Sequence, residues 1–144
     1  MKQFKGKSGK IHPLARSIRI NANNSKEFFL IHGYSGSPTD FTDLSKFLYK
    51  KFNANVYAPL LVGHGTKIDD LPPLNFEDFL EHTEEELKKE LKKGRKVIIG
   101  GTSFGAQLAL ILASRYPVLA VFSITAPHKL KFPLNFPPLL FLRR

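Results

Sequence analysis

The chain has 144 residues, a formal net charge of +10 and 42% hydrophobic residues, which fits one domain or part of one. It contains no cysteine, and this excludes a disulfide framework and a thiolate metal site. No uninterrupted apolar stretch reaches the ~18 residues of a membrane span. No secretory signal follows the basic N-terminus, so we expect a cytoplasmic protein.

Strand and helix patterns alternate along the chain. Residues 1–10 are polar and basic, and we expect them to be mobile. Beyond them, β-branched and aromatic runs predict strands, whereas apolar residues at helical spacing predict helices. The strands are predicted over 14–20, 27–31, 55–59, 97–99 and 118–124, and the helices over 39–51, 76–93 and 104–116.

Two of the helices have recognisable faces and ends. Asn75 is the predicted N-cap of the helix over 76–93, and Gly94 is predicted to end it. The acidic residues of this helix come first and its lysines last, as the helix dipole favours. The side chains predicted to face the core are Phe41, Leu44, Phe47 and Leu48 in the helix over 39–51, and Phe76, Phe79, Leu80, Thr83, Leu87 and Leu91 in the helix over 76–93. The three glutamates at 84–86 are predicted to form a solvated face.

This alternation with short connections predicts an α/β fold, with a mostly parallel sheet and helices on both faces. In such sheets the functional site lies at the carboxyl ends of the strands. The loops that carry His32 and His64, the turn at Ser103 and the segment ending at Pro127 each follow a predicted strand. We therefore expect these segments to gather at one edge of the sheet.

The most informative stretch is 96–110, a β-branched run followed by a glycine-rich turn and an apolar helix. Within it, Gly101-Thr102-Ser103-Phe104-Gly105 fits G-x-S-x-G, the pattern of a nucleophile elbow. Glycine fits two residues before and after the serine because a side chain there would collide with neighbouring backbone. The N–H of Phe104 would begin the helix and point at a developing oxyanion. The alternative is a glycine-rich turn with an incidental serine.

Taken together, three segments resemble the α/β-hydrolase fold. They are His32-Gly33-Tyr34-Ser35-Gly36-Ser37-Pro38, the stretch 59–65 with its Gly63-His64-Gly65, and the elbow at 101–105. Within that fold, the chain is similar to small bacterial carboxylesterases and to the monoacylglycerol-lipase-like group. The resemblance extends from residue 27 to about residue 127.

The resemblance implies roles for particular residues. Ser103 matches the nucleophile, whose hydroxyl forms an acyl-enzyme that water hydrolyses. The backbone N–H groups of Tyr34 and Phe104 match the oxyanion hole. His32, Gly33 and His64 lie on the pocket loops, and the resemblance implies that the two histidines shape these loops. The implied substrate is a small-molecule ester, and neither a metal nor a cofactor is expected, because the sequence has no clustered metal ligands and no dinucleotide-binding motif.

The sequence departs from this family after the elbow. The family's chain order is serine, acid, histidine, but no Asp or Glu follows Ser103, and the one downstream histidine, His128, comes too early. We therefore expect an N-terminal part of a hydrolase core over 1–128, with 129–144 as the start of a cap or lid or as an exposed apolar tail. Three explanations stay open: a truncated product, one half of a split enzyme whose partner supplies acid and base, or a chain that folds alone with His64 or His128 as an improvised base.

The charge distribution and the predicted sheet topology indicate which kinds of partner the chain could bind. An incomplete parallel sheet has an open edge, which a C-terminal half or a second copy would cover. Residues 91–144 carry nine Lys and Arg and no acidic side chain, which indicates a lysine-rich surface or acidic sequence of the same fold outside this chain. No nucleic-acid motif accompanies these charges, so nucleic acid is not an expected partner.

The leading hypothesis is a serine carboxylester hydrolase of the esterase or lipase type. Thioesterase, serine peptidase and amidase activities on the same fold are alternatives. From a different class, a non-catalytic binding or membrane-surface module would use the apolar, proline-broken tail beside a basic surface.

Overall fold

A computed structural model describes residues 11–66 and 74–127 of the chain. Five strands form one sheet in the order β1-β3-β2-β4-β5, with β1 (Ile18–Ile20), β2 (Lys26–Ile31), β3 (Asn55–Ala58), β4 (Lys96–Thr102) and β5 (Ala120–Ile124). Strands β2 to β5 pair in parallel, and β1 pairs antiparallel with β3 at one edge. The mostly parallel α/β sheet predicted from the sequence is therefore confirmed.

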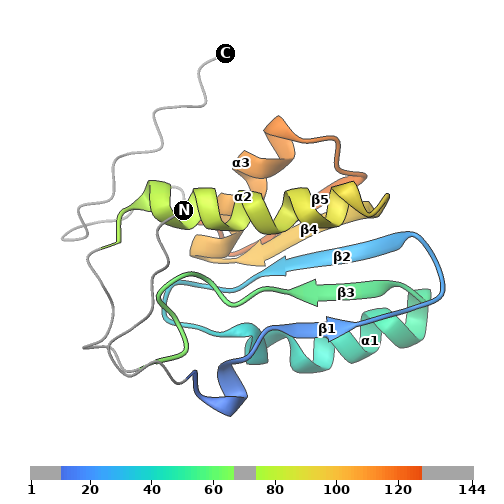
Figure 1. Ribbon diagram of the computed structural model, residues 1–144, viewed down its shortest axis with the longest axis horizontal. Helices are drawn as coiled ribbons and strands as arrows, with labels where there is room; N and C mark the ends of the chain where they lie inside the picture. The colour runs from blue at the N-terminus through green and yellow to red at the C-terminus, as the bar shows by residue number, and fades with distance from the viewer. Residues whose placement is uncertain (1–10, 67–73, 128–144) are drawn as a thin grey trace.

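The helices lie on both faces of the sheet, as Figure 1 shows. On one face, α2 (Phe76–Lys92) and α3 (Phe104–Arg115) pack against Phe29, Val97 and Ile99 of the central strands. On the other face, α1 (Thr42–Phe52) packs with Leu48 against Leu30 and Val56. Two short 3-10 helices complete the described part, η1 (Pro13–Ala15) and η2 (Pro38–Phe41).

The start of the chain differs from the strand predicted over 14–20. Pro13 fixes the first residue of η1, and the Nδ1 atom of His12 accepts the N–H of Leu14 at 3.2 Å. Only Ile18–Ile20 remains extended and pairs with β3. The predictions for residues 1–10 and 129–144, including a mobile segment and a cap or tail, lie outside the described residues.

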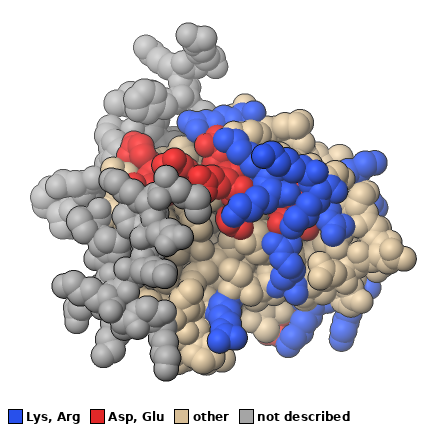
Figure 2. Space-filling model, in the orientation of Figure 1, with Lys and Arg blue, Asp and Glu red and all other residues tan. Residues whose placement is uncertain are grey.

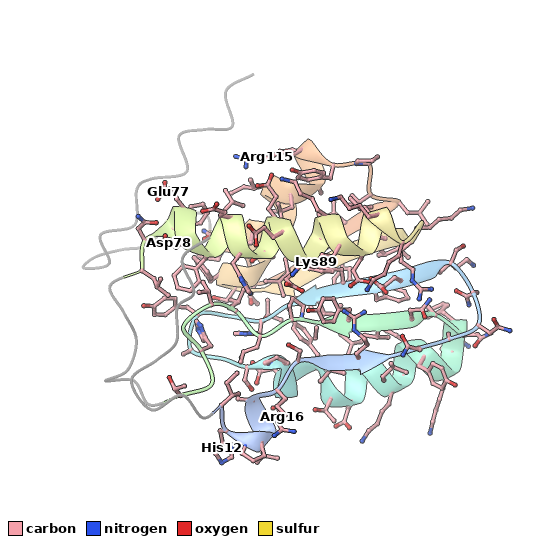
Figure 3. The ribbon with its side chains drawn as sticks, viewed as in Figure 1. His12, Arg16, Glu77, Asp78, Lys89 and Arg115 are labelled. Atoms are coloured by element: carbon pink, nitrogen blue, oxygen red, sulfur yellow. The ribbon has the colours of Figure 1, made fainter. Side chains whose placement is uncertain are left out.

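Local sequence signals place α2 as expected. Asn75 and Asp78 form a reciprocal capping box, in which the Asn75 side chain accepts the N–H of Asp78 and the Asp78 carboxylate accepts the N–H of Asn75, each at 2.9 Å. Gly94 follows the helix at a φ of 74°. Figure 3 shows Glu77 and Asp78 at the first turn of α2 and Lys89 further along, so the charges follow the helix dipole.

Two predictions about helix faces are wrong. Phe47 does not face the core but is 55% exposed on α1, where its ring contacts that of Phe52. The glutamates at 84–86 are not simply a solvated face, because Glu84 accepts the Tyr116 hydroxyl and Glu86 accepts the Tyr57 hydroxyl, each at 2.5 Å. These bonds fasten α2 to β3 and to the end of α3.

Charges are segregated on the surface over α2. Figure 2 shows acidic side chains toward the first half of the helix and a group of Lys and Arg over its second half and the turn to β4. The exposed lysines there include Lys92, Lys93 and Lys96. No helix in the described part of the chain is both long and apolar enough to cross a bilayer.

Two carboxylates are buried beneath this basic surface, at the amino ends of the strands. Glu27 on β2 and Glu90 on α2 are each 1% exposed. Glu90 accepts hydrogen bonds from Arg19 at 2.8 Å and from Lys93 at 2.9 Å, and the Arg19 guanidinium lies 3.7 Å from the centre of the Tyr57 ring. The edge strand β1 is thereby tied across β3 to α2.

Glu27 is less well compensated than Glu90. Its nearest ion-pair contact is Arg95 at 3.7 Å, and within residues 11–66 and 74–127 its Oε1 atom accepts no hydrogen bond. Burial, followed by the negative charge of Glu90, raises the pKa of Glu27 to about 7. Burial also acts to raise the pKa of Glu90, but hydrogen bonds from Arg19 and Lys93 outweigh it and lower that pKa.

We predict that Glu27→Gln changes the pH dependence of stability. The folded chain holds the Glu27 proton more tightly than the unfolded chain, so the contribution of Glu27 to stability is lost as pH rises from about 4.5 to about 7. The neutral variant should therefore be more stable than the parent at pH 8, by about 1–3 kcal/mol, and should lose this advantage at pH 5. Urea denaturation at the two pH values measures the difference. Glu81→Gln, which changes an exposed glutamate on α2, should leave the pH profile unaltered.

Candidate active site

Ser103 occupies a strained turn between β4 and α3. Its backbone has φ 52° and ψ −118°, a conformation that non-glycine residues rarely adopt. Its carbonyl accepts the N–H of Ala106 at 3.1 Å and so begins α3, while its own N–H donates to the carbonyl of Ile124 on β5 at 2.9 Å. The side chain is exposed at the carboxyl edge of the sheet.

Close backbone contacts require the two glycines of this turn. A Cβ atom added to Gly101 would lie 2.5 Å from the backbone of Gly105. A Cβ atom on Gly105 would overlap the carbonyl oxygens of Ile31 and His32 at the end of β2. The turn therefore lies directly against the segment that leaves β2, and this contact accounts for both glycines of the sequence pattern.

The turn after β2 is held by His32, which is fully buried. Its Nδ1 atom lies 2.8 Å from the carbonyl oxygen of Gly33, and its Nε2 atom lies 3.1 Å from the backbone nitrogen of Leu61. Because the Leu61 N–H must donate to Nε2, the proton of the neutral ring is on Nδ1. Burial is the main cause that lowers the pKa of His32 to about 4, so the ring is neutral at neutral pH.

These contacts set the direction of the next peptide. The Gly33 carbonyl also accepts the N–H of Gly36 at 3.0 Å. In a trans peptide the carbonyl and the following N–H point in opposite directions, so fixing the Gly33 carbonyl fixes the direction of the Tyr34 N–H. Gly33 itself is close to the elbow, because a Cβ atom at this position would lie 3.6 Å from Cβ of Ser103. The turn that carries Tyr34 and the turn that carries Ser103 are therefore neighbours.

His64 comes from the loop after β3 and contacts the same turn. Its Nε2 atom lies 2.5 Å from the carbonyl oxygen of Tyr34, and its Nδ1 atom lies 3.1 Å from that of Val62. A neutral ring carries one proton and can donate to one of these carbonyl oxygens, and the shorter contact assigns that proton to Nε2. His128, the other candidate for an improvised base, lies outside the described residues.

Aromatic rings surround Tyr34, and the sequence patterns did not predict this cluster. The Tyr34 ring makes edge-to-face contacts with His64, Phe79 and Phe104, at centroid distances of 5.8 to 6.0 Å. It remains 44% exposed. Helical spacing placed Phe79 on the inner face of α2, but no local signal indicates that this face meets the turn after β2.

The structure thus brings together the six residues predicted for the site, His32, Gly33, Tyr34, His64, Ser103 and Phe104, from three loops or turns at the same sheet edge. The oxyanion role of the Tyr34 and Phe104 N–H groups and the nucleophilic role of Ser103 stay predictions. Among residues 11–66 and 74–127, no three His, Asp or Glu side chains are grouped as metal ligands.

The mostly parallel sheet, the elbow at Ser103 and the neighbouring turn after β2 together define a class of protein. The sequence pattern of the Alpha/beta hydrolase family matches residues 28–144, and the chain belongs to that family. The thermostable monoacylglycerol lipase of Bacillus sp. (strain H-257) is 32% identical over 88 residues, which are 61% of this chain and 35% of that protein.

Solved structures share the fold. The structure reported for LipS and LipT, two metagenome-derived lipolytic enzymes, superposes with a TM-score of 0.76 at 20% identity, over 86% of this chain and 51% of that one. MenH from S. aureus superposes with a TM-score of 0.57 at 20% identity, over 75% of this chain and 41% of that one. The chain spans about a third of the length of the lipase and about half of the first structure.

We predict that Gly105→Ala and Gly94→Ala differ sharply in stability. Gly94 has a φ of 74° but no atom within 4 Å of an added Cβ, so alanine there meets backbone strain alone and should cost about 1–2 kcal/mol. Alanine at 105 adds overlap with two carbonyl oxygens and should cost about 3 kcal/mol or more. Urea denaturation measures both. Equal losses would contradict the close contact between the elbow and β2.

Proposed function

We propose that this protein is a serine carboxylester hydrolase that reacts through an acyl-enzyme on Ser103. The observation that carries the proposal is the exposed Ser103 on a positive-φ turn, packed against the turn that bears Tyr34. Strained residues at such positions cluster in active sites, where they present a reactive group. Membership of the Alpha/beta hydrolase family and similarity to a lipase support an ester substrate.

In the proposed reaction, the Ser103 hydroxyl oxygen attacks the ester carbonyl carbon and its proton passes to a general base. The carbonyl oxygen becomes an oxyanion, which the N–H groups of Tyr34 and Phe104 would stabilise. Loss of one such donor typically costs about 3–4 kcal/mol of transition-state stabilisation. Collapse of the intermediate releases the alcohol, and water then hydrolyses the acyl-serine ester to regenerate the hydroxyl.

The chain has no residue that matches the general base of its family. His32 is neutral but has both nitrogens engaged with backbone, and His64 faces two carbonyl oxygens. We therefore propose that an acid and a histidine are supplied by further polypeptide, and that the 144-residue chain alone hydrolyses esters slowly. A serine without its base is a weak nucleophile.

The edge at β5 is where such polypeptide would attach. The side chains of β5 alternate between the two faces but are exposed on both, including Val121 at 41% and Ile124 at 43%, and Leu119 just before the strand is 60% exposed. In the described part of the chain, β5 pairs on one side only, with β4. We propose that a C-terminal half or a second copy covers this edge. We also propose that the protein is cytoplasmic.

Labelling of the nucleophile tests the proposal. A fluorophosphonate should modify Ser103, slowly in the 144-residue chain and faster in a form of the protein that carries its acid and histidine. Tryptic cleavage after Lys96 and Arg115 gives the peptide 97–115, in which mass spectrometry locates the adduct. Ser103→Ala should abolish the modification. Ser114→Ala is the matched control, because Ser114 is exposed on the same peptide but donates to the Ile111 carbonyl on α3. Hydrolysis of p-nitrophenyl esters that survives unchanged in Ser103→Ala would refute the assignment.

We also predict that charge on the open edge reduces association. Lysine on an edge strand opposes pairing with another strand. Val121→Lys should therefore lower the concentration-dependent mass measured by size-exclusion chromatography with light scattering. Leu14→Lys changes a side chain that is 71% exposed on η1, away from this edge, and should leave association as in the parent. The same mass for parent and both variants would rule out the β5 edge as the contact.

A further inference from the structure

Two histidines from different loops hold consecutive carbonyl groups of the turn after β2. His32 contacts the Gly33 carbonyl at 2.8 Å, and His64 contacts the Tyr34 carbonyl at 2.5 Å. Their rings pack edge-to-face with centroids 5.0 Å apart. The two loops can meet because β2 and β3 are parallel, so that the loops after them leave the sheet at the same end, as Figure 1 shows.

His64 is held as firmly as the turn that it contacts. Its second nitrogen lies 3.1 Å from the Val62 carbonyl in its own loop, and its ring packs edge-to-face against Phe79 of α2 at 5.9 Å. A carbonyl oxygen only accepts and a neutral imidazole carries one proton, so the shorter contact, to Tyr34, assigns that proton to Nε2 and not to Nδ1. The hydrogen bond therefore runs from the β3 loop to the β2 turn.

Contacts with the two histidines hold the backbone on both sides of the Tyr34 Cα atom. His32 and Gly36 fix the peptide before Tyr34 through the Gly33 carbonyl, and His64 fixes the peptide after it through the Tyr34 carbonyl. With both planes held, the φ and ψ of Tyr34 have little freedom, and the Tyr34 N–H keeps one direction. Contacts of this kind hold a donor ready before charge develops.

We propose that His64 is a positioning residue of the oxyanion turn, which orients the Tyr34 N–H by donating a hydrogen bond to the Tyr34 carbonyl. This role rests on the proposed hydrolase function for its purpose, but the hydrogen bond itself can be tested without activity. His64 acts through Tyr34, whose carbonyl its Nε2 atom contacts. The role differs from that of His32, which belongs to the turn and stabilises it from within.

Two substitutions at one position separate the hydrogen bond from the ring. His64→Phe keeps an aromatic ring against Tyr34 and Phe79 but removes the donor, whereas His64→Gln places an amide N–H where Nε2 was. His82→Phe is the matched control, because His82 on α2 also contacts a carbonyl of the β3 loop, that of Leu60 at 3.1 Å, but not the turn after β2.

The first measurement is hydrogen exchange of the Gly36 amide, whose bond to the Gly33 carbonyl closes the turn. In the full 144-residue chain, His64→Phe should accelerate this exchange about three- to tenfold, the loss expected for one hydrogen bond. His64→Gln should restore the parent rate, and His82→Phe should match the parent. Equal exchange in His64→Phe and the parent, or equal acceleration in His82→Phe, would overturn the proposal.

The second measurement is the rate of fluorophosphonate labelling at Ser103, which depends on stabilising the phosphoryl oxygen. His64→Phe should slow labelling about tenfold or more, and His64→Gln should recover most of the rate. Equal labelling rates for the two variants would overturn the positioning role even if the exchange rates differ. If Ser103 is not labelled in any of the proteins even on long incubation, the slow acyl-enzyme chemistry proposed for the 144-residue chain fails, and the exchange measurement still decides whether His64 holds the turn.

Discussion

The backbone of the β4–α3 turn lies against the carboxyl end of β2 with no space for a side chain between them. This contact determines three features of the candidate site. Gly101 and Gly105 are required, because a Cβ atom at either position would meet backbone atoms. The chain can then reverse sharply only through a positive φ at Ser103, which directs the serine side chain outward. The same contact places Gly33 beside Ser103, so the turn after β2 and the serine share one small space.

At the amino ends of the strands, buried charged groups impose a different constraint. There, Arg19 reaches from β1 across the Tyr57 ring to Glu90, and the weakly compensated Glu27 lies beside this pair. Glu27 and His32 occupy the two ends of β2 and respond oppositely to pH. The unfolded chain protonates its histidine more readily than the folded one, so the contribution of His32 is lost as pH falls from about 6.5 to about 4, whereas that of Glu27 grows over part of this range. One strand thus carries compensating pH dependences.

The sequence predicts those parts of the fold that depend on neighbours along the chain. The elbow glycines, the Asn75 cap and the Gly94 terminus are local, and the structure has them where the patterns place them. Features that depend on distant partners could not be predicted. The burial of Glu90 requires Arg19, which is 71 positions away in the sequence. Without that partner in view, a glutamate beside lysines on a helix predicts a solvent-exposed position. Phe47 fits an apolar helical face, but it is 55% exposed and its ring contacts that of Phe52 on the same helix.

The histidines illustrate why residue type alone does not define a catalytic role. His32 and His64 lie on the loops nearest a candidate nucleophile, where an imidazole would ordinarily suggest a general base. Their nitrogens instead meet backbone groups of the turn after β2 and the loop after β3, at distances of 2.5 to 3.1 Å. Nδ1 of His32 and Nε2 of His64 each donate to a carbonyl oxygen and so already carry a proton, while Nε2 of His32 already accepts the Leu61 N–H. The contacts of these two side chains therefore serve to orient peptide groups, and the proposed reaction at Ser103 would need a different proton acceptor.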